Sequence, residues 1–353
     1  MIEGKTFAER LIYWYTERKR DLPWRKTKDP YPVWLSEIIL QQTRVDQGLP
    51  YWVQFMEAYP TVHNLADASE EKVLRLWQGL GYYSRARNLH ATAKYVANEL
   101  NGQFPSKYSE IIKLKGIGPY TAAAIASICF DEPRPVVDGN VFRFASRYFG
   151  IEEDISKANS RKVFERILSE EISKDQPGTF NQAMMEYGAT ICSPVPLCGD
   201  CGFRLDCFAF RAKKQKSLPV KTGKTKVRNR QFHYIVFREG NNFFLNERVG
   251  KDVWSGLFDF YLIEGVASEE LVMSLIKENW GIDEATLDDV SEPFIHILSH
   301  QKIHATFYTM SISAMDVKRL GEKSSLRAYS TEEMLNLPKP KLIVNYLQRI
   351  GIT

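Results

Sequence analysis

The sequence predicts a protein of two domains, an all-helical domain over residues 1–210 and an α+β domain over residues 231–353. Apolar residues recur at helical spacing through the first part, whereas they alternate with polar residues, as in strands, through the last part. A length of 353 residues allows two domains of ordinary size. Residues 211–230 are basic and poor in apolar side chains, so we expect them to link the two domains.

The first domain is expected to consist of helices joined by turns that contain Pro, Gly or Asn. This part shows neither an alternating strand pattern nor an internal repeat of fixed period. The periodic apolar stretches cover residues 7–15, 34–56, 70–80, 84–100, 108–114, 120–129, 141–149 and 160–171.

The C-terminal domain begins with the pattern of a β-hairpin. Residues 232–238 and 243–248 are strand-like and flank Gly240-Asn241-Asn242, which suits a turn. A third strand-like stretch covers residues 252–264. A helix is expected over Glu269 to Trp280, and further strands are expected around residues 294–313.

Composition excludes several classes of protein. A hydrophobic fraction of 44% and an aromatic fraction of 12% support packed cores. No apolar run reaches the length of a membrane span, and residues 1–20 lack the layout of a signal peptide. Four of the five cysteines lie within sixteen residues, unlike the framework of a secreted disulfide protein. We therefore expect a cytoplasmic protein without a membrane partner.

The excess positive charge lies in one short segment. Residues 1–210 carry equal numbers of basic and acidic side chains, and residues 231–353 are net acidic. Residues 211–230 contain nine Lys or Arg and no acidic residue, although the whole chain carries a net charge of only +4. A solvated linker accounts for this composition, and a contact with a polyanion is compatible with it.

Residues 114–143 hold the motif around which the first domain is organised. Gly116-Ile117-Gly118-Pro119 predicts a tight turn between two helices, with Pro119 at the first position of the second helix. The free amides at that helix start, backed by the helix dipole, form an anion site that fits a DNA phosphate. Asp138-Gly139-Asn140 follows an apolar stretch, which suggests a carboxylate held at a site. A plain helix–turn–helix pair, with Asp138 capping the next helix, explains the same residues.

Glu37 is a candidate general acid. It lies between Trp34-Leu35 and Ile38-Ile39-Leu40, and a carboxyl group in apolar surroundings has a raised pKa. Ser36 is a possible cap for a helix whose first turn carries Glu37. In that arrangement Glu37 would simply complement the helix dipole, which is the alternative explanation.

Residues 79–87 form a Gly-punctuated aromatic loop that leads into a basic helix start. Tyr82 suits insertion between stacked bases, and Arg87 suits a phosphate contact. An ordinary loop with packed tyrosines is the alternative.

The cysteine spacing predicts a metal site at Cys192, Cys198, Cys201 and Cys207. A zinc ribbon needs two C-x2-C pairs, and this stretch has one. An iron–sulfur cluster accepts four cysteines of irregular spacing. Cys129 lies in an Ala-rich helix and is expected to be an inert core residue.

Residues 1–210 resemble the helix-hairpin-helix DNA glycosylases that carry an iron–sulfur cluster, and more narrowly the MutY-type adenine DNA glycosylases. The matching motifs are WR–DPY–WLSEIILQQT (residues 24–43), GLGYYSRARNL, LKGIGPYTAAAI, VDGNVFR, FNQAMMEYGA and the four cysteines. The resemblance extends more weakly over residues 231–353. It implies an all-α glycosylase domain with a 4Fe–4S cluster, followed by an α+β NUDIX-like domain.

The resemblance implies that Glu37 protonates the adenine leaving group and that Asp138 stabilises the sugar cation, with Tyr120 and Asn140 beside it. Breaking an N-glycosidic bond needs such a proton donor and such a negative charge once the base has left the duplex. Endonuclease III has a catalytic lysine where this chain has Tyr120, so a monofunctional glycosylase is expected. The residues expected to contact DNA or a base are Arg25, Gln42, Tyr82, Arg87, Gly116, Gly118, Arg143 and Gln182.

In the C-terminal domain the resemblance implies recognition of 8-oxoguanine through Ser299 and His300, which follow Leu298 where the family has Phe. The acidic helix of NUDIX pyrophosphatases is missing from residues 262–281, so a binding domain without its own metal chemistry is expected. The histidines at 296, 300 and 304 are expected in a connector. The loop between the first two cysteines is one residue shorter than usual in the family and uncharged.

The expected partner is duplex DNA with adenine opposite 8-oxoguanine or guanine, bound by a monomer. Two alternatives remain. A bifunctional pyrimidine glycosylase of the endonuclease III type is disfavoured by Tyr120, and a non-catalytic lesion binder is disfavoured by Glu37 and Asp138 together.

Overall fold

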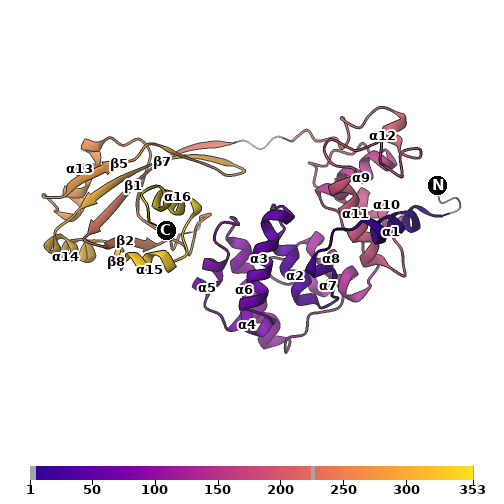
Figure 1. Ribbon diagram of the computed structural model, residues 1–353, viewed down its shortest axis with the longest axis horizontal. Coiled ribbons are helices and arrows are strands. Elements are labelled where there is room, and N and C mark those ends of the chain that lie inside the picture. The colour runs from indigo at the N-terminus through magenta and orange to yellow at the C-terminus, as the bar shows by residue number, and fades with distance from the viewer. Residues whose placement is uncertain (1–4, 224–226, 251, 353) are drawn as a thin grey trace. The chain divides into compact units, whose positions relative to one another are not determined.

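The computed structural model describes residues 5–223, 227–250 and 252–352. The chain divides into two compact units (Figure 1). The first contains Met1–Asp67 and Asn88–Gly223, and the second contains Ala68–Arg87 and Lys224–Thr353. Residues 68–87, which carry helix α5 (Glu70–Leu76), therefore cluster with the C-terminal part of the chain.

The first unit is helical, as expected. Within the described residues, no helix combines the length and apolar composition that crossing a bilayer requires. Helix α6 (Ser84–Glu99) begins among the residues of the second unit and continues into the first. The other elements are α1 (Phe7–Arg18), η1 (Pro23–Arg25), α2 (Pro30–Ile39), α3 (Val45–Ala58), α4 (Val62–Asp67), α7 (Tyr108–Ile111), α8 (Pro119–Phe130), α9 (Gly139–Phe149), α10 (Ser160–Glu171), α11 (Pro177–Thr190) and α12 (Phe208–Arg211).

Two features of these helices differ from the helices that the apolar periodicity predicts. The single stretch expected over 34–56 is two helices, α2 and α3, because the chain turns between them and Gln42 has a positive φ of 59°. Helix α11 was not expected as a periodic stretch. Most of its residues are buried, and a helix that is covered on several sides has no single apolar stripe.

Small residues bring α8, α9 and α11 close together in the core of the first unit. A Cβ added at Gly178 of α11 would lie 2.6 Å from the Ser127 carbonyl oxygen of α8. One added at Gly188 would lie 2.5 Å from the Asn140 carbonyl oxygen of α9. Both glycines therefore permit backbone contacts that any other residue would push apart. The start of α9, where Asp138 lies, is positioned by this packing.

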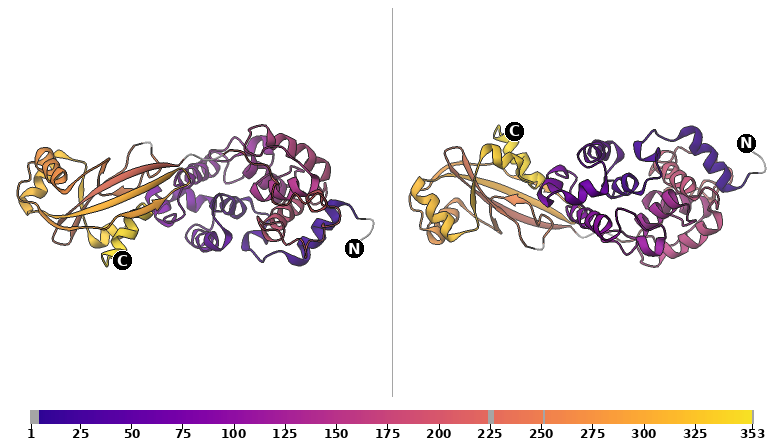
Figure 2. Two further views of the ribbon diagram at one scale, coloured as in Figure 1. Left: turned by 90° about the horizontal axis from the view of Figure 1, so that it is seen from above. Right: turned by 90° about the horizontal axis from the view of Figure 1, so that it is seen from below.

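The second unit is built on a mixed sheet in which β1 and β7 run parallel and the other strand pairs are antiparallel. Both views in Figure 2 show these two long strands side by side. The expected hairpin is confirmed, since Glu239 of β1 pairs with Asn242 of β2. The strands are β1 (Arg228–Glu239), β2 (Asn242–Glu247), β3 (Phe258–Asp259), β4 (Tyr261–Glu264), β5 (Thr286–Val290), β6 (Phe294–Ile297), β7 (Gln301–Ser311) and β8 (Arg327–Ser330).

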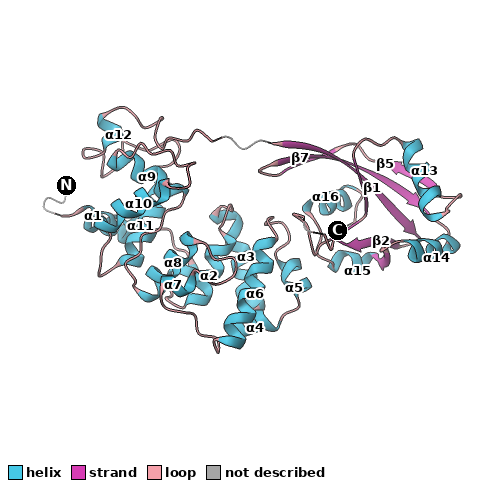
Figure 3. Ribbon diagram, turned by 180° about the vertical axis from the view of Figure 1, so that it is seen from behind, coloured by secondary structure: helices cyan, strands magenta, loops and turns pink. Residues whose placement is uncertain are grey.

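Helices cover the sheet of the second unit (Figure 3). Helices α13 (Glu269–Trp280), which is confirmed as expected, and α14 (Ala314–Lys323) join one core with Ile235 and Phe237 of β1. Helix α16 (Lys341–Arg349) contributes Tyr346, whose ring stacks on Phe307 of β7 at 4.0 Å. A short helix, α15 (Thr331–Asn336), follows β8.

The basic segment over residues 211–230 is not a free linker along its length. The carbonyl oxygen of Val220 accepts a hydrogen bond from the Ile155 amide at 3.0 Å, and Leu218 is buried. The Asp154 carboxylate accepts a hydrogen bond from the Thr222 hydroxyl. Residues up to 223 thus pack on the first unit, and residues from 228 belong to β1, while residues 224–226 lie outside the described residues.

Candidate active site

A cleft of about 900 Å³ in the first unit collects most of the residues predicted to act in catalysis or to contact DNA. It is lined by residues of η1, α2, α8, α9 and α11 and by the turn between α2 and α3. The predicted residues that line it are Arg25, Glu37, Gln42, Tyr120, Asp138, Asn140, Arg143 and Gln182.

Glu37 lies in the last turn of α2, so the expected capping by Ser36 is wrong. The N-cap is Asp29, whose carboxylate accepts a hydrogen bond from the Tyr31 amide at 2.9 Å. The Ser36 hydroxyl instead donates to the Val33 carbonyl oxygen at 2.7 Å. A carboxylate near the C-terminus of a helix is disfavoured by the helix dipole. The position of Glu37 therefore does not stabilise a negative charge, contrary to the dipole explanation.

Burial raises the pKa of Glu37 to about 7. A hydrogen bond with the Tyr120 hydroxyl lowers this pKa, the negative charge of Asp138 raises it, and Arg25 lowers it. The side chain of Glu37 is inside the protein yet faces the cleft. At neutral pH a sizeable fraction of this carboxyl group therefore carries a proton, as a general acid requires.

Asp138 both caps helix α9 and faces the cleft. Its carboxylate accepts hydrogen bonds from the Val141 amide at 2.7 Å and from Nδ2 of Asn140 at 2.9 Å. Burial raises the pKa of Asp138, while these two hydrogen bonds oppose the rise. Asp138 therefore caps α9, as the structural explanation expected. The same hydrogen bond holds its carboxylate at the cleft, where it can also take part in chemistry.

Tyr120 adds a neutral hydroxyl that is hydrogen-bonded to Glu37 and interacts with the charge of Asp138. Burial raises its pKa well above 10, and its oxygen lies 3.0 Å from the sulfur of Met185. Among the described residues that line the cleft there is no lysine. Around Tyr120 the described residues of the cleft thus offer the acid of Glu37, the carboxylate of Asp138 and a hydroxyl group, but no lysine amine that could act as a nucleophile.

A buried ion pair, which sequence reasoning missed, holds Arg25. The Glu186 carboxylate accepts hydrogen bonds from Nη2 of Arg25 at 2.7 Å and from Nε and Nη2 of Arg20, each at 2.7 Å. Burial raises the pKa of Glu186, but the hydrogen bonds from both arginines outweigh this and bring it to about 2. The signal was present in the sequence, because Glu186 follows Gln182 by four residues and so shares its helix face.

Arg143 uses its guanidinium for contacts inside the first unit. It donates to the carbonyl oxygens of Cys192 at 2.8 Å and Gly188 at 2.6 Å, and to Oδ1 of Asn140 at 2.8 Å. These bonds fix the Asn140 side chain, which in turn donates to Asp138. Contact of Arg143 with DNA stays a prediction.

The Gly116–Gly118 turn has the geometry expected of a tight hairpin. Gly116 has a φ of 76°, and an added Cβ would lie 2.5 Å from Cβ of Asn88. Gly118 is the N-cap of α8 and has no neighbour within 4 Å of an added Cβ. The amides at the start of α8 are therefore not covered by a capping side chain.

The remaining predicted residues lie in the second unit. Tyr82 is 45% exposed, has a φ of 47°, and donates from its hydroxyl to Oγ of Ser299 at 2.7 Å. Oγ of Ser299 lies 3.3 Å from Nδ1 of His300. Arg87 donates to the Ser255 carbonyl oxygen. The structure thus brings Tyr82, Ser299 and His300 together, whereas Arg87 is engaged with the backbone.

The three histidines do not share a connector, which corrects that expectation. His296 lies in β6 with its ring 5.8 Å from that of Trp254, and burial lowers its pKa. His304 lies in β7. Only His300 lies in the turn, because the alternation of strands β6 and β7 continues on both sides of it.

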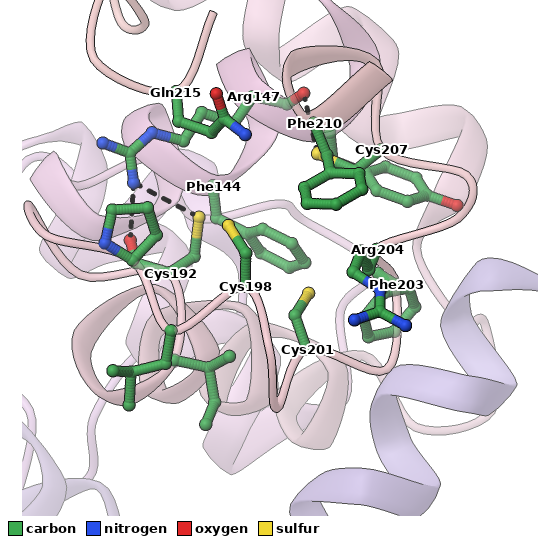
Figure 4. A pocket seen from close by; sticks show the side chains of 14 residues that line it. Phe144, Arg147, Cys192, Cys198, Cys201, Phe203, Arg204, Cys207, Phe210 and Gln215 are labelled. Carbon is green, nitrogen blue, oxygen red and sulfur yellow. Dashed lines mark hydrogen bonds between the residues drawn. The ribbon is translucent and has the colours of Figure 1, made fainter. Parts of the chain in front are cut away.

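The four clustered cysteines line one cavity beside α9 (Figure 4). Two sulfurs face hydrogen-bond donors: Sγ of Cys201 lies 3.2 Å from the Tyr187 hydroxyl, and Sγ of Cys192 lies 3.6 Å from Nη1 of Arg147. Four thiols that line one cavity, two of them facing such donors, suit an iron–sulfur cluster or another thiophilic metal centre. Within the described ranges, no three His, Cys, Asp or Glu side chains already form a metal-ion site.

The short loop after Cys192 is held by Arg147. Its guanidinium donates to the carbonyl oxygens of Ser193 at 2.7 Å and Pro194 at 3.2 Å. Cys129 lies apart from this cavity, and burial raises the pKa of its thiol to about 12, which agrees with an unreactive core residue.

Comparison with known proteins agrees with this geometry. Residues 35–170 match the family described as HhH-GPD superfamily base excision DNA repair protein, and residues 233–349 match the NUDIX domain. Among solved structures, a thermostable thymine-DNA glycosylase is 26% identical with a TM-score of 0.54, covering 58% of this chain and 95% of that one. A trapped endonuclease III–DNA covalent intermediate, 21% identical with a TM-score of 0.51 over 58% of this chain and 94% of that one, shares the fold.

Curated relatives extend the match to nearly the whole chain. The adenine DNA glycosylase of Buchnera aphidicola subsp. Acyrthosiphon pisum is 32% identical over 349 residues, 98% of each chain. The human adenine DNA glycosylase is 41% identical over 226 residues, 61% of this chain and 41% of that one. The helical fold, the NUDIX-like unit and the resemblance predicted from the motifs are confirmed, and the chain belongs to the adenine DNA glycosylase family.

Proposed function

We propose that this protein hydrolyses the N-glycosidic bond of adenine mispaired with 8-oxoguanine or guanine in duplex DNA. The observation that carries the proposal is the buried Glu37, whose pKa is about 7, beside Asp138 and Tyr120 in one cleft. A buried proton donor and a carboxylate that face one cleft suit the departure of a neutral purine from a developing sugar cation.

In the proposed reaction the adenine nucleotide leaves the base stack and enters the cleft. Glu37 gives its proton to a ring nitrogen as the bond between the sugar C1′ and the base nitrogen breaks. The Asp138 carboxylate faces the positive charge that develops on the sugar, and Asn140 keeps it in place through their hydrogen bond. Adenine departs with that proton. Water then adds at C1′ and passes a proton to the Glu37 carboxylate, which leaves an abasic sugar and restores the acid.

Other residues hold the DNA in the proposed complex. Arg25 and Gln182 contact the flipped base, while the amides around Gly116 and Gly118 bind a phosphate. Gln42 and Tyr82 fill the gap that the flipped base leaves in the stack. Both residues are exposed and have positive φ angles, as residues in tight turns often do. Arg87 and Arg143 are proposed to contact phosphates of the DNA backbone.

We assign lesion recognition to the turn between β6 and β7, where Ser299 and His300 offer hydrogen-bonding groups on the surface. The hydrogen bond from Tyr82 to Ser299 supports a shared role, since both would act at the base pair being probed. The proposed partner is duplex DNA, which a monomer binds. The proposed location is the cytoplasm, with the bacterial chromosome.

The decisive experiment is an adenine-release assay on duplexes with adenine opposite 8-oxoguanine, guanine or thymine. Duplexes with an oxidised pyrimidine and with a G·T mismatch serve as controls. Release from the first two duplexes alone supports the proposal. Excision of the pyrimidine with strand cleavage would favour a bifunctional enzyme, and tight binding without release would favour a lesion binder.

We further propose that Cys192, Cys198, Cys201 and Cys207 hold a 4Fe–4S cluster. The group would cross-link the segment that follows α11, where Cys192 lies, to the loop that carries Cys198, Cys201 and Cys207. Hydrogen bonds from Arg147 to the Ser193 carbonyl oxygen and from Tyr187 to Cys201 already hold both parts. A cavity lined mainly by apolar side chains and cysteines, with two donors facing sulfur, suits such a centre.

Removing one ligand tests the cluster. The purified protein is expected to be brown and to contain iron, and Cys198→Ser is expected to lower the iron content and the unfolding temperature. The loss of DNA affinity should be larger than the loss in the rate of bond cleavage, since other residues line the cleft. Cys129→Ser is the matched control and should keep its iron. Stoichiometric zinc without iron after anaerobic preparation would contradict the assignment.

A second test concerns the basic segment. Lys213 and Lys216 are exposed, whereas Lys214 is paired with Glu152. Replacing Lys213 and Lys216 by Gln should reduce the slope of log affinity against log salt by about 0.9 for each phosphate that the segment no longer neutralises. Lys214→Gln, whose charge is already compensated, should change the slope less. An unchanged slope in the double variant would show that the segment does not bind DNA.

A further inference from the structure

The orientation of the Gln182 side chain is set by a residue outside the cleft. The hydroxyl of Tyr15, on α1, lies 2.6 Å from Oε1 of Gln182 on α11. This separation is typical of an O–H···O bond and shorter than the usual N–H···O distance. Tyr15 therefore donates, and the carbonyl end of the Gln182 amide accepts.

Tyr15 is suited to this task because it cannot easily move or ionise. It is 2% exposed, and burial raises the pKa of its hydroxyl to about 12, while Arg25 lowers it and Glu186 raises it. The guanidinium of Arg25 lies 5.4 Å from its ring centre. The hydroxyl is thus a donor throughout the physiological pH range, and its position is fixed by the core.

With its oxygen taken, Gln182 presents its NH₂ group to the cleft. Among the described residues, the amide nitrogen of Gln182 donates no hydrogen bond, and Gln182 is only half-buried at the cleft wall. Its neighbour Arg25 is also a donor and is already bonded to Glu186. This wall therefore offers an available amide donor in a fixed direction.

We propose that Tyr15 is a positioning residue for base specificity: it turns the Gln182 amide so that NH₂ donates to a ring nitrogen of the flipped purine. This inference rests on the function proposed above. Adenine has unprotonated ring nitrogens that can accept such a bond. If the amide were free to turn over, its oxygen would instead face the same nitrogen, and two acceptors would repel each other.

The test compares Tyr15→Phe with Tyr13→Phe, a matched change on the same helix at a side chain that is 51% exposed. Affinity is measured in a Glu37→Gln background, in which base release is slow relative to the binding measurement, for duplexes with adenine or 1-deaza-, 3-deaza- or 7-deazaadenine opposite 8-oxoguanine. Tyr15→Phe should weaken adenine binding about fivefold to thirtyfold, and Tyr13→Phe should not. For the one analogue that lacks the contacted nitrogen, the effect of Tyr15→Phe should disappear.

Gln182→Met supplies a second arm, because it keeps the length of the side chain and lacks both amide atoms. Tyr15→Phe should add no further loss in that background. An equal loss for adenine and all three analogues, an additive loss with Gln182→Met, or no difference from Tyr13→Phe would overturn the proposal. Failure of the proposed function is distinguishable, since the unmodified protein would then release no adenine at all.

Discussion

Glu37→Gln is expected to slow single-turnover adenine release by about 10²–10⁴, the range for loss of a general acid. The substitution keeps the shape of the side chain but leaves no acidic proton to transfer. Binding to the mismatch should persist, because the hairpin and the second unit are untouched. Release and affinity are measured on the same duplex, and near-normal release would remove Glu37 from the mechanism.

The pH dependence gives an independent check on Glu37. Because its pKa is about 7, the rate of the unmodified protein should fall as pH rises above 7, and Glu37→Gln should lose this alkaline limb. Stability should respond at lower pH than the rate does, between the ordinary and the folded-state pKa. The folded-state pKa lies above the ordinary value of 4.5, so stability present below pH 4.5 is lost as pH rises to about 7. Glu37→Gln avoids this loss and should therefore melt at a higher temperature at pH 8.

A suitable control is Glu186→Gln, which replaces a buried carboxylate with the opposite pKa shift. Glu186 has a pKa of about 2, so its contribution to stability is present above pH 4.5 and is lost only as pH falls toward 2. Glu186→Gln should therefore melt at a lower temperature at pH 8. Equal responses of the two variants would contradict the assigned environments.

Most of the cleft was predictable because its residues lie in compact motifs whose order and spacing survive in the sequence. Glu37, Asp138 and Tyr120 belong to three such motifs, and helix packing brings them to one cavity. The hairpin of β1 and β2 was predictable for a different reason, since two runs rich in aromatic and aliphatic residues flank a turn that contains Gly240.

Long-range partners were not predictable from local patterns. The parallel pairing of β1 with β7 joins residues about seventy positions apart in the chain, and no local periodicity encodes it. The bonds of Glu186 to two arginines join α11 to η1, which contains Arg25, and to the loop before it, which contains Arg20. Local chemistry also misled at Ser36, where a cap residue occurs inside a helix and bonds back to the preceding turn.

Asp138→Asn is expected to slow adenine release by about 10²–10³, the usual loss when a well-placed electrostatic stabiliser is removed. Asn is itself a good N-cap, so the hydrogen bond from the Val141 amide can be kept and α9 should remain folded. Affinity for the mismatch should be maintained or increased, since a negative charge near the DNA is lost. Asp138→Ala, which also removes the cap, should be less stable than Asp138→Asn.

The same substitution should act on Glu37, which separates an electrostatic role for Asp138 from a purely structural one. The negative charge of Asp138 raises the pKa of Glu37, so its removal should move the alkaline limb of residual activity to lower pH. A cap alone would leave that limb in place. The measurement is a pH–rate profile of Asp138→Asn beside the unmodified protein, and a profile that is lowered but not displaced would show that the two carboxyl groups do not interact in the cleft.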